Sequence, residues 1–251
     1  LERALPSVLE LPLGGTAVGT GLNTHPEFAA KAIEDLSSQV GLPFTEARNH
    51  FEAQAARDAL VELSGALKTV ALSMAKIAND IRWLASGPRC GIGELQLPEV
   101  QPGSSIMPGK VNPVIAESVL MVVATVVGND ATVSFGNFGG SNFELNTMMP
   151  VMASATLSSI ELLAASANNF ATQCVDGIKP NKERLLQLAE ASTAICTSLA
   201  PKIGYDKAAS IAKDAYKSGE SVRAVALRVS GLPEAEVHAS LDLLKMTQPG
   251  L

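Results

Sequence analysis

The chain has 251 residues and a formal net charge of −6, with no basic cluster in its sequence, which argues against nucleic acid and anionic membrane surfaces as partners. Hydrophobic residues make up 47% of the chain but aromatic residues only 4%, so the core must be aliphatic, which favours closely packed helices over a β-sandwich. No apolar run reaches the about 18 residues of a membrane span without a charged residue, glycine or proline, so we expect no spanning segment.

The first predicted feature in chain order is the glycine-rich segment 13–23. It differs from a phosphate-binding loop because no strand pattern precedes it and no Gly-Lys-Ser/Thr follows, so we expect a tight turn between helices. From residue 50 to about residue 86 the chain has no proline, Gly65 is its one glycine, and apolar residues recur at three-and-four spacing. This predicts one long helix, apolar over most of its surface, which must be buried on several sides and therefore indicates oligomerisation.

Two further long helices are predicted, from residue 113 to about 133 and from about 149 to 172, with a Gly/Asn-rich turn at 136–142 between them. Three long helices joined by short loops predict a bundle. After about residue 175 the predicted helices become shorter and more charged. The sequence therefore predicts an all-α fold, with a long-helix bundle as central domain (1–174, its beginning missing) and a small helical C-terminal domain (175–251).

Residues 103–113, with the sequence GSSIMPGKVNP, predict a loop that leads into a helix. Two glycines and two prolines exclude a regular element through the segment, which leaves backbone N–H groups unpaired. Asn112 is a suitable N-cap, and Pro113 fits the first helical position. A helix N-terminus beside Lys110 favours the binding of a carboxylate or phosphate.

This loop, which we call the serine loop, resembles the signature GSSxMPxKxNP of the aspartase/fumarase superfamily. The segments 13–23, 76–91, 142–146 and 203–209 are similar to those of the class II fumarases in particular. Such an enzyme reversibly eliminates water from (S)-malate to give fumarate. The resemblance further implies a cytoplasmic homotetramer whose active sites are shared between subunits, and neither a metal nor another cofactor.

The resemblance also implies roles for individual residues. Ser104 would be the catalytic base, because Lys110, loop amides and the helix dipole could stabilise its alkoxide. Ser105, Lys110, Val111 and Asn112 match the positions that bind the substrate carboxylates. Glu117 matches a catalytic glutamate that orients a proton-donating histidine, although a glutamate in a first helical turn also compensates the helix dipole without any catalytic role.

Other features of the chain leave alternatives open. The Thr-His block that carries the proton donor in the family is absent, and none of His25, His50 and His238 replaces it. The chain starts at Leu1 inside a helical pattern, so we expect it to be a fragment. The family resemblance implies that about the first two-fifths of such an enzyme are missing and that the chain alone is poorly active. An aspartase-type ammonia-lyase and a non-catalytic assembly protein of the same fold remain as alternatives. Three cysteines without metal-ligand spacing predict free buried thiols in a reducing compartment.

Overall fold

The computed structural model describes residues 1–250 and is 64% helical, which confirms the predicted all-α fold. The α-helices are α1 (Leu5–Leu9), α2 (Phe28–Val40), α3 (His50–Ala55), α4 (Asp58–Leu84), α5 (Val114–Gly139), α6 (Met149–Gln173), α7 (Lys182–Ala191), α8 (Ala200–Ile203), α9 (Tyr205–Ser218), α10 (Val222–Val229) and α11 (Glu234–Ser240). The strands have two residues each: β1 (Glu10–Leu11), β2 (Thr45–Glu46), β3 (Leu95–Gln96), β4 (Ser141–Asn142), β5 (Leu145–Asn146) and β6 (Lys179–Pro180).

The described residues divide into two compact units. The first comprises residues 1–85 and 97–178, and the second comprises 86–96 and 179–251. The segment 86–96 belongs to the second unit because β3 pairs antiparallel with β6 and because Asn181 donates its backbone N–H to the carbonyl of Glu94 at 2.8 Å. The sequence pattern did not predict this pairing, which joins residues more than 80 positions apart.

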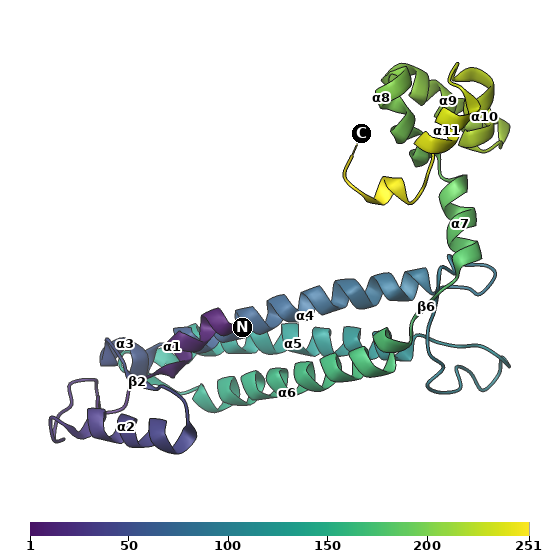
Figure 1. The fold of residues 1–251 in the computed structure, drawn as a ribbon. Helices are drawn as coiled ribbons and strands as arrows, with labels where there is room; N and C mark the ends of the chain where they lie inside the picture. Colours follow the sequence, from purple (N-terminus) through teal and green to yellow (C-terminus); the bar gives the residue numbers. More distant parts are fainter. Residues whose placement is uncertain (251) are drawn as a thin grey trace. The chain divides into compact units, whose positions relative to one another are not determined.

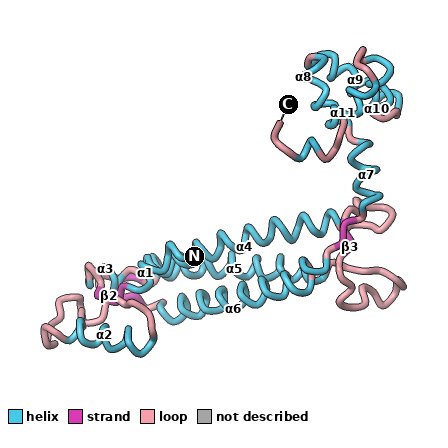
Figure 2. The backbone as a smooth tube through the Cα atoms, in the orientation of Figure 1, coloured by secondary structure: helices cyan, strands magenta, loops and turns pink. Residues whose placement is uncertain are grey.

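The first unit is built on a bundle of α4, α5 and α6, which lie side by side (Figure 1). Loops, drawn pink in Figure 2, gather at the two ends of this bundle. The buried positions of α5 recur at spacings of three and four residues, as in the seam of a coiled coil. They are Ala116, Val119, Val123, Val126, Asp130, Val133 and Gly136. The three predicted long helices are therefore present, although two of them have different bounds.

The predicted long helix from residue 50 was wrong at its start, because the structure breaks it into α3 and α4. Ala56 adopts an extended conformation, with φ −77° and ψ 160°. The backbone N–H of Arg57 donates to Asn137 Oδ1 at 2.6 Å. In a continuous helix this N–H would instead donate to the backbone carbonyl of the residue four positions earlier. Burial lowers the pKa of Arg57, and the carboxylate of Glu52 opposes that shift.

The predicted end of α5 near residue 133 was also wrong, because the helix continues to Gly139. Gly136 was read as part of a turn, but it is buried inside the helix. A Cβ atom at this position would lie 2.5 Å from Met152 Cγ on α6, so the glycine permits a close approach of the two helices.

A polar cluster lies in the middle of the bundle, in the interface between α4 and α5. Asp130 is 7% exposed, accepts a hydrogen bond from Ser64 Oγ at 2.9 Å, and forms an ion pair with Lys68. Because a buried carboxylate is stable only when it is paired and hydrogen-bonded, these three residues fix the register of the two helices.

The outward face of α5 carries apolar side chains that the single chain leaves exposed. Met121 is 69% exposed and Phe138 73%, and the charged residues of this helix are Glu117 and Asp130. By length and composition alone, α5 (mean hydropathy 1.6) and Met149–Gly177 (1.2) could cross a membrane. The sequence analysis expected no such segment, because Gly128 and Asp130 interrupt the run.

The second unit has its own aliphatic core, which includes Leu199, Ile211, Val225 and Val237. The breaks predicted at Gly204, Gly219 and residues 231–233 are confirmed, because α9 lies between the first two and α11 follows Pro233.

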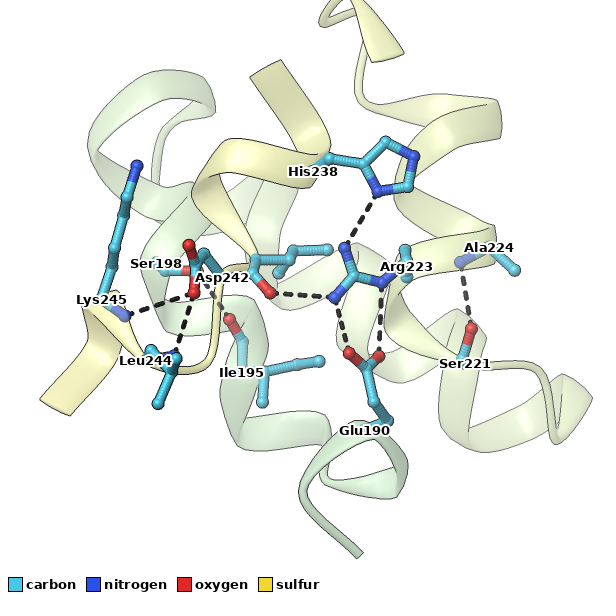
Figure 3. A network of polar contacts seen from close by, with 11 residues as sticks. Glu190, Ile195, Ser198, Ser221, Arg223, Ala224, His238, Asp242, Leu244 and Lys245 are labelled. Carbon is cyan, nitrogen blue, oxygen red and sulfur yellow. Dashed lines mark hydrogen bonds and ion pairs between the residues drawn. The ribbon is translucent and has the colours of Figure 1, made fainter. Parts of the chain in front are cut away.

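Arg223 joins three segments of this unit (Figure 3). Its Nη2 donates to Glu190 Oε1 at 2.6 Å and to the carbonyl of Leu241 at 2.9 Å. Its Nη1 lies 3.1 Å from His238 Nδ1. This network links α7, α10 and the end of α11 by charge-assisted hydrogen bonds.

The three cysteines are free thiols in unequal surroundings. Cys174 and Cys196 are buried, as predicted, and burial raises the pKa of both thiols. Cys90 is exposed, so the prediction of a buried thiol was wrong there.

We expect the native 251-residue chain to react quickly with one equivalent of a thiol reagent, because the thiolate is the reacting form and two of the thiols are both shielded and held protonated. Titration with a chromogenic disulfide before and after adding denaturant would measure this. Three equally fast thiols in the native chain would contradict the burial of Cys174 and Cys196.

Candidate functional site

The serine loop leads directly into α5, but the helix begins one residue later than predicted. Val114 is the first helical residue, and Pro113 occupies the N-cap position without a side-chain hydrogen bond. The predicted capping role of Asn112 was therefore wrong. Its Nδ2 instead donates to the carbonyl of Gly103 at 2.5 Å, which ties the two ends of the loop together.

Glycine is required at position 103 for this closure. A Cβ atom there would lie 1.9 Å from the carbonyl oxygen of Lys110, a separation that no side chain could tolerate. The loop is thus a closed structure whose ends touch and whose central residues project from the bundle.

Ser104 is held inside the loop by backbone amides. Its Oγ accepts hydrogen bonds from the N–H groups of Ile106 at 3.2 Å and Met107 at 3.0 Å. Hydrogen bonds donated to an oxygen favour its negatively charged form, so this arrangement would stabilise a serine alkoxide. The sequence analysis attributed this role to loop amides in general, and the structure identifies these two.

The other predicted binding residues of the loop face solvent. Ser105, Lys110 and Val111 are all exposed, and Val111 is 43% exposed. Lys110 takes part in none of the ion pairs recorded within residues 1–250. Ile106, at the tip of the loop, is 86% exposed. The loop therefore presents a cation, hydroxyls and amides to the outside of the bundle.

Glu117 lies in the first turn of α5, and its carboxylate faces Arg82 near the end of α4. Glu117 Oε1 and Arg82 Nη2 are 3.9 Å apart, and both side chains are about one-third exposed. The sequence analysis missed Arg82 as a site residue, because it treated residues 76–91 only as part of a family resemblance. The antiparallel pairing of α4 and α5 is what brings the arginine to Glu117.

The cavity recorded beside the loop is too small for a substrate. The cavity at the start of α5 is lined by Asn112, Pro113, Ala116 and Cys174 and holds about 10 Å³, room for about one water molecule. A larger cavity of about 570 Å³ is lined by residues of α1, α3 and α4 and by Arg48 and Arg57, which lie just before α3 and α4. None of the predicted site residues lines it.

The recorded hydrogen bonds of His25 and His50 are made outside the serine loop. His25 Nδ1 accepts the backbone N–H of Glu27 in a turn, at 3.2 Å. His50 Nε2 lies 3.2 Å from the carbonyl of Leu13. Within residues 1–250 no group of three His, Cys, Asp or Glu side chains could hold a metal ion.

Two family models match the chain. The model described as "Lyase" matches residues 1–128, and the one described as "Fumarase C C-terminus" matches residues 195–248. The first of these ranges includes the serine loop and the beginning of α5, and the second covers most of the second unit's core.

Curated relatives and solved structures agree with these models. The "Fumarate hydratase class II" of Nitrosomonas europaea is 52% identical over 99% of this chain and 54% of its own length. That of Methylorubrum extorquens is 55% identical over 94% of this chain and 50% of its own length.

A fumarate lyase:delta crystallin from Brucella melitensis bound to cobalt superposes with a TM-score of 0.92 at 45% identity, covering 99% of this chain and 54% of that one. A class II fumarase from Schistosoma mansoni gives 0.91 at 34% identity, covering 100% of this chain and 57% of that one. The chain thus spans about half the length of the relatives it matches.

Proposed function

Because the chain belongs to the class II fumarase family of lyases, we propose that it supplies the serine loop and the central helices of a fumarate hydratase. The whole enzyme would reversibly eliminate water from (S)-malate to give fumarate. The observation that carries the proposal is Ser104, whose hydroxyl is held by two amides in a loop that also displays Lys110.

The reaction requires a base, a cradle for a carboxylate that gains negative charge, and an acid for the departing hydroxyl. We assign the base to Ser104, whose alkoxide the amides of Ile106 and Met107 would stabilise. Lys110, Ser105, Val111 and Asn112 would bind the substrate carboxylates, with Lys110 supplying the charge. Glu117 would orient a proton-donating histidine from another segment, since His25, His50 and His238 lie outside the loop's contacts.

The cavity beside the loop is too small for malate, which supports an active site completed by other segments or subunits. The exposed apolar face of α5 supports the same proposal, because burial of that face against copies of the bundle would remove apolar surface from water. We therefore propose a cytoplasmic homotetramer with shared sites. Asp130 is paired with Lys68 inside the bundle, an arrangement that suits packing against protein better than packing against lipid.

The test compares this chain with a completed enzyme, defined as this chain joined to the part of the Nitrosomonas europaea enzyme that lies outside the match. We expect the completed enzyme to convert malate to fumarate, measured by the absorbance of fumarate, and the 251-residue chain alone to be poorly active. Aspartate serves as the alternative substrate. Faster release of fumarate from aspartate than from malate would contradict the proposed reaction, and equal turnover by both proteins would contradict the shared site.

A further inference from the structure

Arg82 is only partly engaged by the groups around it. Its Nη1 donates to Asn79 Oδ1 at 3.3 Å, and its Nη2 stands 3.9 Å from Glu117 Oε1. A charge-assisted hydrogen bond between these groups would measure about 2.8 Å. The guanidinium is therefore close to the Glu117 carboxylate without being bonded to it.

The Nε atom of Arg82 is buried and has no hydrogen-bond partner within the described chain. Buried polar groups are almost always hydrogen-bonded, because leaving a donor unpaired costs its full desolvation penalty. The Nε and Nη2 groups of arginine form a planar fork that matches the two oxygens of a carboxylate. Closing the Nη2–Oε1 distance from 3.9 Å to about 2.8 Å is a shift of about 1 Å, and a bidentate pair formed in this way would also give the orphaned Nε a partner.

We propose that Arg82 is a positioning residue for Glu117: in the assembled enzyme its Nε and Nη2 hold the Glu117 carboxylate in a bidentate pair. The fork fixes the direction of the carboxylate at the start of α5, beside the serine loop. This role rests on the proposed function, in which Glu117 orients the proton donor.

Within residues 1–250, the recorded ion pair of Glu117 is the one with Arg82. The other charged residue of α5, Asp130, is paired with Lys68 in the middle of the bundle. On α6, which packs against another side of α5, the charged residue is Glu161, near the middle of that helix. Cys174, which follows α6, lines the small cavity together with Ala116, the residue before Glu117.

The experiment measures kcat and KM of the completed enzyme with Arg82→Met, which keeps most of the apolar stem. We expect kcat to fall by about 10²-fold, as for a displaced catalytic group, with little change in KM, because the proposed contact of Arg82 is with Glu117 and not with the substrate. Arg82→Lys should not restore kcat, because lysine keeps the charge but lacks the fork. Arg228→Met, which removes an exposed pair with Glu220, is the matched control and should leave both constants unchanged.

A second measurement does not depend on activity. In thermal unfolding of the completed enzyme, Arg82→Met combined with Glu117→Gln should lower the Tm no further than the worse single variant, because both remove the same pair. Additive losses in Tm, or an unchanged kcat in the Arg82→Met enzyme, would overturn the inference. If the unsubstituted enzyme fails to act on malate, the proposed function fails, and the Tm comparison still decides whether Arg82 holds Glu117.

Discussion

Replacing Ser104 by alanine in the completed enzyme should lower the kcat for malate by about 10²- to 10⁴-fold, the contribution of a positioned general base. Alanine cannot accept a proton, and the amides of Ile106 and Met107, which now donate to Ser104 Oγ, would have no serine alkoxide to stabilise before the proton transfer. The absorbance of fumarate measures the rate.

Two controls separate the chemistry from a general loss of structure. Ser104→Ala should still bind fumarate by calorimetry, because Lys110 and Asn112 remain. Ser105→Ala, the neighbouring hydroxyl with a proposed binding role, should mainly raise KM. An unchanged rate in Ser104→Ala would remove the assignment of the base, even if the completed enzyme is a fumarate hydratase.

Replacing Lys68 by methionine should destabilise the protein by about 3 kcal/mol, near the lower end of the cost of removing one partner from a buried ion pair. The lower end applies because the side chain of Lys68 is 39% exposed, whereas that of Asp130 is only 10% exposed. The remaining carboxylate would keep Ser64 as its recorded donor and would lie uncompensated between α4 and α5. Urea unfolding at a fixed protein concentration measures the free energy.

The same substitution elsewhere on α4 provides the control. Lys76 forms an exposed ion pair with Asp80, with side chains 75% and 48% exposed, so Lys76→Met should cost less than about 0.5 kcal/mol. The double variant Lys68→Met with Asp130→Asn should regain part of the loss, because it removes the buried charge. If Lys68→Met costs no more than Lys76→Met, the buried cluster does not stabilise the bundle.

The helices themselves could be predicted from the sequence, because their apolar periodicity is a local property. The break before α4 could not, because Ala56 and Arg57 have no local signal for it. The break depends on Asn137, 80 residues further along the chain, which accepts the backbone N–H of Arg57. At Gly136 the error was the opposite one, because a turn was predicted where the helix continues. A glycine usually indicates a turn, but here it accommodates Met152 of the neighbouring helix.

The candidate site was predictable in its residue types but not in its contacts. The serine loop was identified by its residues and by resemblance. The predicted role of Asn112 as an N-cap was wrong, because its side chain donates to the carbonyl of Gly103 instead. Arg82 could not be selected from the sequence, because its importance arises only when α4 and α5 run antiparallel. A search for basic residues in the last turn of the helix that precedes the serine loop could have found it.

The closure of the serine loop at its base has a consequence for the thermodynamics of substrate recognition. A flexible segment of this length would lose conformational entropy on capturing a ligand, and that loss would weaken affinity. Because the Asn112 side chain and the Gly103 carbonyl already join the two ends, less conformational entropy remains to be lost when the segment orders around a ligand.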